Sequence, residues 1–177
     1  MMQMLKAGGI PPLTDNLRPP DENNPRGYFE FEPVKKLGTD QTWIDQARGR
    51  AIKIIHLLVG ELPTDGRFRY RLILMRRPME QILASQRVML ERAGKTSGDP
   101  ELLRRAFEAQ LSQLEKWLSA QPQFAVLSVY YPDLIENPET AATRIDNFLG
   151  GGLAVDAMVR AIDVGLYRQR GDSTTKD

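Results

Sequence analysis

The sequence predicts an α/β domain whose mainly parallel sheet is flanked by helices. Three apolar runs have the length of strands, residues 51–58, 70–75 and 124–129. None of them alternates polar with apolar residues, so we expect all three to be buried on both faces, as parallel strands under helices are. Longer segments with helical signals separate these runs, and this alternation is typical of an α/β domain.

Start and stop signals define the helices. Pro78, Asp99-Pro100 and Asn137-Pro138 each open one, because Pro fits the first helical turn and Asp or Asn can cap it. The glycines at 150–152 end the last of these helices. The expected helices cover residues 1–7, 28–37, 41–47, 78–93, 99–119 and 137–149.

Composition limits the kind of protein. The 177 residues suit one domain over residues 1–170 with a flexible tail over 171–177. A net charge of +1 gives no signature of a nucleic-acid partner. The absence of cysteine excludes cysteine-based zinc sites, and the single histidine, His56, excludes a multi-histidine metal site within one chain. No apolar run approaches the ~20 residues of a membrane span, so we expect a cytoplasmic protein with no membrane partner.

Two arginines directly follow the expected strand 70–75 and precede a helix. Ligands of open α/β sheets bind outside the carboxyl ends of the strands, and helix N-termini attract phosphate. Arg76 and Arg77 are therefore candidate phosphate ligands, and Ser85 joins them if its helix lines the pocket. Surface ion pairs for the arginines, with simple packing of Ser85, are an equally good alternative.

Three further residues near the expected strands are candidates for chemistry. Tyr131 follows the third strand and is the residue there that best suits a planar ligand. Lys53 interrupts the run 51–58, where it either meets an anion at the sheet edge or extends into solvent. His56 on the same run is a packed residue in the simpler interpretation. Because positions 53 and 56 differ by an odd number, a continuous strand points them to opposite faces.

A long loop rich in Pro, Asn and Asp covers residues 11–27, and long loops in compact domains are often functional. At its end, Arg26, Tyr28 and Glu30 combine charge with an aromatic ring beside a flexible Gly27. We expect these three residues to form a gate over a substrate. The alternative is an ordinary loop that closes onto the core through its aromatic residues.

Three of these segments resemble the sulfotransferase family, in particular its bacterial branch. The run RLILMRRPMEQILAS is similar to the element that binds the 3′-phosphate of the nucleotide, in which an arginine and a serine stand eight positions apart, as Arg77 and Ser85 do. The runs YYPDLIENPETAATRIDNFLGG and DENNPRGYFEFEPV are similar to further family segments. The resemblance covers about residues 1–170 and implies a P-loop NTPase-like fold.

The resemblance also implies an activity. The family transfers a sulfonyl group from 3′-phosphoadenosine 5′-phosphosulfate to a hydroxyl or amine of a small-molecule acceptor. By this resemblance Arg77 and Ser85 hold the 3′-phosphate, Tyr131 lies near the adenosine, and Lys53 lies near the position of a catalytic lysine or histidine. His56 is the second catalytic candidate, although it is out of register with that position. A base would deprotonate the acceptor and cations would neutralise the transferred group.

One departure from the family pattern is large. The family opens with a central strand and a phosphate loop rich in Gly, Arg, Ser and Thr, and this sequence contains neither that segment nor a G-x-x-x-x-G-K-[ST] motif. The first residues, MMQMLKAGGI, are similar to the helix after that loop. We therefore expect a truncated chain that has little activity by itself. Its remaining strands would either close up or pair between chains.

Three other functions stay open at this point. The chain is a non-enzymatic nucleotide or anion binder if it uses only Arg77 and Ser85. It is a relative of the P-loop kinases if it prefers ATP, although it lacks their characteristic lysine motif. It is a structural or partner-binding protein if the helix 100–119 uses its polar face for recognition. The acceptor and the oligomeric state cannot be inferred from these residues.

Overall fold

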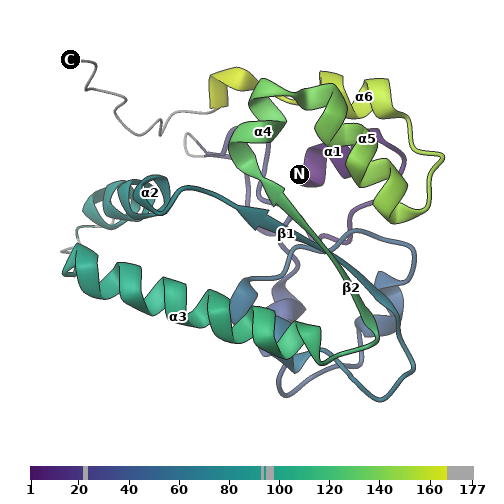
Figure 1. Ribbon diagram of the computed structural model, residues 1–177, viewed down its shortest axis with the longest axis horizontal. Coiled ribbons are helices and arrows are strands. Elements are labelled where there is room, and N and C mark those ends of the chain that lie inside the picture. The colour runs from purple at the N-terminus through teal and green to yellow at the C-terminus, as the bar shows by residue number, and fades with distance from the viewer. Residues whose placement is uncertain (22–23, 93, 95–97, 167–177) are drawn as a thin grey trace.

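The computed structural model describes residues 1–21, 24–92, 94 and 98–166. Two parallel strands form its centre, β1 (Tyr70–Arg76) and β2 (Phe124–Tyr130), with Tyr70 opposite Phe124 and Arg76 opposite Tyr130. The two long helices α2 (Met79–Arg92) and α3 (Pro100–Ser119) connect them (Figure 1). This crossover brings the chain back to the start of the sheet, as parallel strands require.

The third expected strand is not formed. Within the run 51–58, Ala51 makes an isolated parallel bridge with Pro12, and His56 begins the 3₁₀ helix η3 (His56–Glu61). A strand needs a hydrogen-bonded neighbour along its length, and no described segment lies against this run as a ladder. The described fold is therefore a two-stranded parallel sheet flanked by helices, and a larger P-loop-like sheet stays a prediction.

The expected helices over 78–93, 99–119 and 137–149 are confirmed as α2, α3 and α5 (Pro138–Leu149), and residues 1–7 contain α1 (Met2–Ala7). The other two are short 3₁₀ helices, η1 (Glu32–Lys36) and η2 (Ile44–Ala47). The remaining described helices are α4 (Tyr131–Glu136), α6 (Val155–Arg160) and the 3₁₀ helix η4 (Val164–Leu166). The expected tail, 171–177, lies outside the described residues.

Helix α4 determines the position of Tyr131. It begins at Tyr131, immediately after β2, and carries Pro132 and Asp133 in its first turn. Both residue types favour a helix start, Pro through its fixed φ angle and Asp through the helix dipole. Tyr131 is therefore fixed at the carboxyl end of β2 by a helix rather than by a loop.

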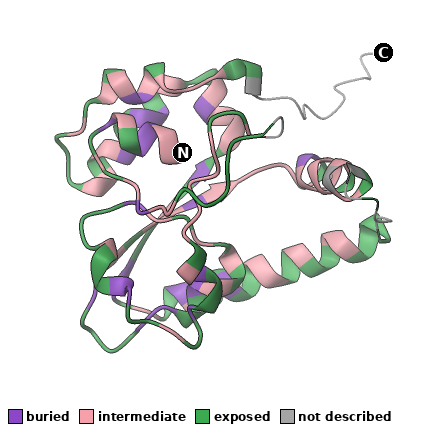
Figure 2. Cartoon of the chain, turned by 180° about the vertical axis from the view of Figure 1, so that it is seen from behind, coloured by how far each residue is buried: buried purple, intermediate pink, exposed green. Residues whose placement is uncertain are grey.

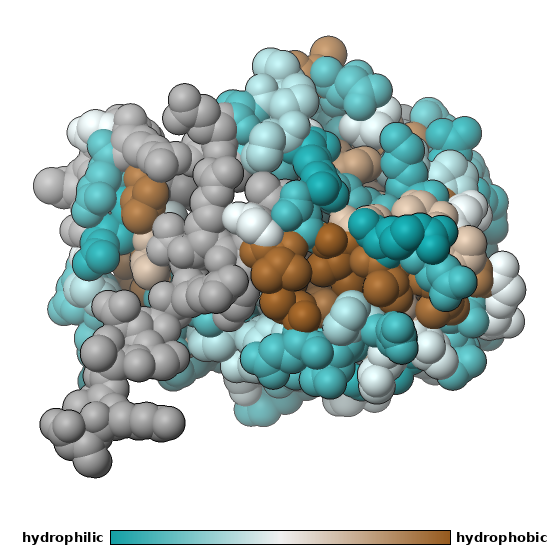
Figure 3. Space-filling model, turned by 90° about the horizontal axis from the view of Figure 1, so that it is seen from above, coloured by the Kyte–Doolittle hydropathy of each residue, from teal (hydrophilic) through white to brown (hydrophobic). Residues whose placement is uncertain are grey.

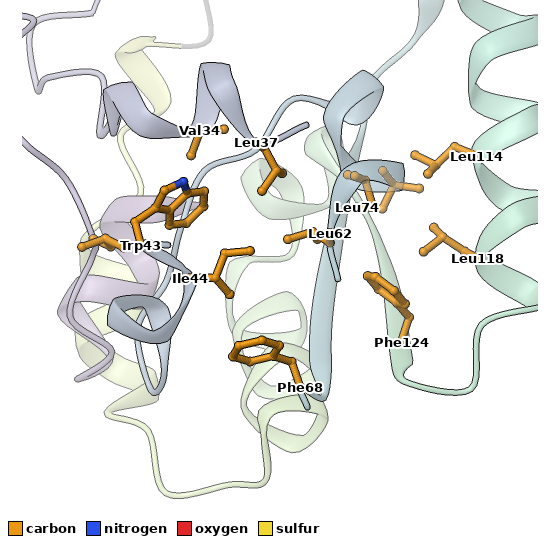
Figure 4. Packing of buried hydrophobic residues seen from close by; sticks show 12 residues of the cluster. Val34, Leu37, Trp43, Ile44, Leu62, Phe68, Leu74, Leu114, Leu118 and Phe124 are labelled. Carbon is orange, nitrogen blue, oxygen red and sulfur yellow. The ribbon is translucent and has the colours of Figure 1, made fainter. Parts of the chain in front are cut away.

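One hydrophobic cluster lies between the sheet and α3. Leu74 and Phe124 from the strands pack with Leu114 and Leu118 of α3 (Figure 4). The cluster also contains Leu37, which follows η1, and Trp43 and Ile44 at the start of η2. Side chains alternate along a strand, so Leu74 points to this face while its neighbours Ile73 and Met75 point to the other.

A second cluster covers the opposite face. Val129 of β2 packs with Leu134 of α4, Ile145 of α5 and Met158 of α6, and the short helix α1 adds Met4 and Leu5. On the side of the molecule that carries α5 and α6, apolar residues form a surface band with hydrophilic residues along its borders (Figure 3). The sheet thus separates two cores.

The two halves of α3 differ in their packing. Its C-terminal half carries the buried Leu114 and Leu118, whereas Leu102 near its start is 64% exposed. Figure 2 shows exposed residues over much of the helix and buried ones only near the sheet. Asp99 caps the exposed end by accepting a hydrogen bond from the Glu101 N–H at 2.8 Å.

Candidate functional site: a basic cleft beside β1

A cleft of about 1390 Å³ runs along β1. Residues 67–77, which include all of β1, form one wall, and residues 47–54 contribute to the lining as well. Helix α3 adds Phe107 and Leu111, while β2 contributes only Phe124. The cleft therefore lies on the side of β1 that faces away from β2.

Positive charge dominates the lining of this cleft. It contains eight Lys or Arg residues and the carboxylates of Glu108 and Glu115. Carboxylates outside the lining pair with three of these cations, since Asp45 contacts Arg48, Glu30 contacts Lys53 and Asp65 contacts Arg67. Glu115 is engaged by Arg76, whose Nη1 atom lies 2.7 Å from Glu115 Oε1. A near-neutral chain thus concentrates cations in one concave region, where the field favours an anion.

Arg77 and Tyr131 meet at the carboxyl end of the sheet. Arg77 follows β1 and lines the cleft, Tyr131 follows β2, and the guanidinium carbon lies 4.9 Å from the centre of the Tyr131 ring. Helix α2 starts at Met79, two residues after Arg77. This is the carboxyl edge where ligands of parallel sheets bind.

The position of Ser85 is different. It lies in the second turn of α2, half-buried and outside the residues that line the cleft. The structure therefore brings Arg77 together with Tyr131 but does not place Ser85 in the same cavity.

Lys53 contacts two of the three residues expected to form a gate. Its ammonium donates to the Tyr28 carbonyl oxygen at 3.1 Å, lies 3.5 Å from Glu30 Oε1, and lies 5.8 Å from the centre of the Tyr28 ring. Arg18 is also part of this cluster, 3.1 Å from Glu30 Oε1 and 3.4 Å from the Tyr28 ring centre. Burial, and then the hydrogen bond from its hydroxyl to Asp21, raise the pKa of Tyr28.

The loop that carries Tyr28 and Glu30 is held by the residues before it. The Thr14 hydroxyl donates to the Glu30 carbonyl oxygen at 2.8 Å, and the Glu32 N–H donates to Asp15 at 2.5 Å. The hydrogen bonds from Glu32 and Leu17 to Asp15 lower the pKa of this carboxyl group. The loop is therefore anchored at residues 14–15 and contacts Lys53.

Arg26 lies apart from this gate. Its guanidinium forms an ion pair with Asp163 at 2.7 Å and donates to the Ala161 carbonyl oxygen and to Gln3. It does not line the cleft. Arg26 instead ties the loop to the segment after α6 and to α1.

His56 lines the same cleft as Lys53. The extended chain ends at Ile55 and η3 begins at His56, so the expectation of opposite faces, which holds for a continuous strand, does not apply. The Nε2 atom of His56 lies 3.0 Å from Gln110 Oε1, and its ring centre lies 5.7 Å from that of Phe107. Both catalytic candidates thus border one cavity.

The sequence did not identify the contribution of α3 to this site. Phe107, Leu111 and Glu115 recur at intervals of four residues, which places them on one face of the helix. This spacing shows that the three residues share a face but does not show what the face contacts, and the structure places them at the cleft.

Within the described residues there is no group of three or more His, Asp or Glu side chains able to hold a metal ion. No helix in the same part of the chain has the length and apolarity needed to cross a membrane. No protein-family model matches the chain, and comparisons with curated proteins and with solved structures gave no significant match.

Proposed function

We propose that the carboxyl edge of the sheet binds the 3′-phosphate of an adenine nucleotide, as in the sulfotransferases that the sequence resembles. In this proposal the chain belongs to an enzyme that transfers a sulfonyl group from 3′-phosphoadenosine 5′-phosphosulfate to a hydroxyl or amine. The observation that carries it is the contact between Arg77 and Tyr131 at the adjacent carboxyl ends of two parallel strands.

The chemistry of this edge suits a phosphate. Arg77 offers a planar set of N–H donors, and it lies just before the 14-residue helix α2, whose N-terminal dipole favours an anion. The Tyr131 ring lies beside the guanidinium, with its centre 4.9 Å from the guanidinium carbon. Ser85 would join the phosphate only if α2 turned its second turn toward the cleft.

The roles proposed for transfer belong to Lys53 and His56. Lys53 would neutralise charge on the transferred sulfonyl group, and His56 would accept the proton of the acceptor. Lys53 is now engaged by Glu30, and His56 by Gln110. An incoming anion would therefore compete with Glu30 for the ammonium group.

Calorimetry with adenosine 3′,5′-bisphosphate tests the binding proposal, with adenosine 5′-monophosphate as the ligand that lacks the 3′-phosphate. We expect the bisphosphate to bind more tightly and Arg77→Ala to weaken it tenfold or more, because a charge-assisted hydrogen bond contributes about 1.5–3 kcal/mol. Arg87→Ala is the matched control, since Arg87 lies on α2 and faces Glu91 with 66% of its side chain exposed. Equal affinity for both nucleotides, or an unchanged Arg77→Ala variant, would exclude this site.

A transfer assay separates the enzyme from a simple binder. The sequence lacks the family's phosphate loop, so we expect the 177-residue chain to bind the bisphosphate but to transfer little or no sulfonyl group. Robust transfer by this chain would contradict that expectation. A clear preference for ATP would instead favour the kinase alternative.

A further inference from the structure

The backbone of β1 is paired on one side only. The Tyr70 N–H donates to the Gln123 carbonyl oxygen at 2.8 Å, so the even-numbered residues of β1 turn their N–H and C=O groups toward β2. Those of Arg71, Ile73 and Met75 must point the other way, toward the cleft. Among the described residues these groups form no hydrogen bond with another segment. A strand edge of this kind is a template for another strand.

A second extended segment borders the same cleft. Ala51 exchanges hydrogen bonds with Pro11 and Leu13, at 3.0 and 2.8 Å. The alternation of an extended chain turns the backbone groups of Ile52 and Ile54 away from that partner. Within the described part of the chain their N–H and C=O groups are also unbonded, and both residues line the cleft. Two strand edges that lack partners therefore border one cavity.

The size and lining of the cavity fit a single strand. The volume that a strand occupies is its length times the ~4.8 Å spacing between strands and the ~10 Å spacing between layers. For a strand of seven residues, the length of β1, this product is about 1100 Å³. The cleft measures about 1390 Å³. Ile52, Ile54, Ile73, Met75, Phe107 and Leu111 give it apolar walls, and Lys53, Arg71 and Arg76 add positive charge.

We propose that this cleft binds an extended strand of a partner protein, which pairs with the free edge of β1 and lies between β1 and residues 51–55. The strand is apolar in its middle and carries acidic residues that complement the basic lining. A second copy of the chain does not suit the cleft. Its strands are attached to a sheet, and the cleft has room for a single strand. This inference concerns the long edge of β1 and does not depend on nucleotide binding at its carboxyl end.

Amide hydrogen exchange, resolved by NMR, tests the proposal on the intact chain. The probe is a capped peptide with the sequence FAVLSVY between two glutamates, since this sequence already forms a strand beside β1 in the fold. Without peptide, the amides of Arg71, Ile73 and Met75 should exchange faster than those of Leu72 and Leu74. Saturating peptide should slow those three amides tenfold or more and leave the even-numbered ones unchanged.

Two controls separate pairing from non-specific adhesion. The same peptide with an N-methyl group at every backbone amide can form neither ladder and should give no protection. Ile54→Lys places a charge in the cleft wall and should abolish binding, whereas Leu57→Lys, at a 57% exposed position outside the cleft, should not. Thermal melting of both variants shows whether each is folded, and the N-methylated peptide leaves the protein unaltered.

Three outcomes would overturn the proposal. One is exchange that saturating peptide leaves unchanged. Another is slow exchange of Arg71, Ile73 and Met75 in a peptide-free dimer, which would show that a second copy occupies the edge. The last is slow exchange in a peptide-free monomer, which would mean that residues 51–55 close onto β1.

Discussion

Tyr70 stands where β1 begins, and its hydroxyl donates to the Pro63 carbonyl oxygen at 2.9 Å while its ring stacks on Phe124 with centres 4.5 Å apart. Burial raises the pKa of Tyr70 to about 12, above its ordinary value of 10.0. The folded state therefore keeps this proton over a pH range in which the unfolded chain has released it. One residue thus links the β1 terminus to the pH dependence of stability.

The free energy of unfolding should show this link directly. The contribution of Tyr70 is fully present below pH ~10 and is lost as the pH rises toward ~12, because the neutral phenol is favoured only in the folded state. Urea unfolding between pH 9 and 12 should give a shallower decline for Tyr70→Phe than for the unmodified chain. The pKa of Tyr28 is also raised, so the pH dependence of urea unfolding in Tyr28→Phe is the matched comparison. An unchanged slope in Tyr70→Phe would refute the assignment.

A glycine contact makes a second prediction at this scale. A Cβ atom at Gly8 would lie 2.8 Å from Met158 Cγ and 2.9 Å from its Sδ atom, and Met158 is fully buried. Gly8→Ala should therefore destabilise the protein by about 1–3 kcal/mol through overpacking. Gly60→Ala meets no heavy atom within 4 Å and should change stability little. Chemical denaturation of both variants decides the point, and equal stability would show that Met158 can move.

Among the elements, α3 shows how much local signals predict. The start signal at Asp99-Pro100 predicted the helix, but it did not show that the buried residues of α3, Leu114 and Leu118, lie in its C-terminal half. The strands at 70–75 and 124–129 were predicted to within one residue, because their apolar runs are long and bounded. The run 51–58 has the same local character but forms no ladder with any segment that the structure describes. Local sequence cannot supply that distant neighbour.

Two leucines of α3 test this difference within one helix. Leu114→Ala should cost about 2–5 kcal/mol, as buried leucines do, since Leu114 is 7% exposed. Leu102→Ala, at 64% exposure, should stay within about 0.5 kcal/mol of the unmodified protein. Urea denaturation gives both values. Similar losses would mean that Leu102 is buried in solution and contradict its exposed position on α3.

The same limit applies to the site. The sequence placed Arg77 and Tyr131 each directly after an expected strand, and the pairing of β1 with β2 is what brings the two side chains into contact. The contacts of Lys53 with Tyr28 and Glu30 depend on how residues 14–15 anchor a long loop. Arg26 stands only two residues before Tyr28, yet it pairs with Asp163. This contact also depends on how the loop folds against the rest of the chain. Such contacts are tertiary and have no local signal.

At the scale of the whole molecule, one narrow sheet is shared by two cores. Because Leu74 and Ile73 are neighbours on β1 and pack into opposite clusters, neither core can be lost without disturbing the strand of the other. Circular dichroism and fluorescence should therefore report one coincident unfolding transition. Leu114→Ala and Ile145→Ala, one in each core, should lower stability additively within about 0.5 kcal/mol. Two separate transitions would show that the cores unfold independently.

Trp43 gives this architecture an optical consequence. It is one of two tryptophans, is 4% exposed, packs edge-on against Phe31 with ring centres 5.4 Å apart, and lines the cleft. The other, Trp117, packs against Phe124 on the far side of the first core. A Trp117→Phe form would carry a single fluorophore in the cavity wall. The wavelength of its emission would then report in real time whether water or a ligand occupies that cavity, without any attached dye.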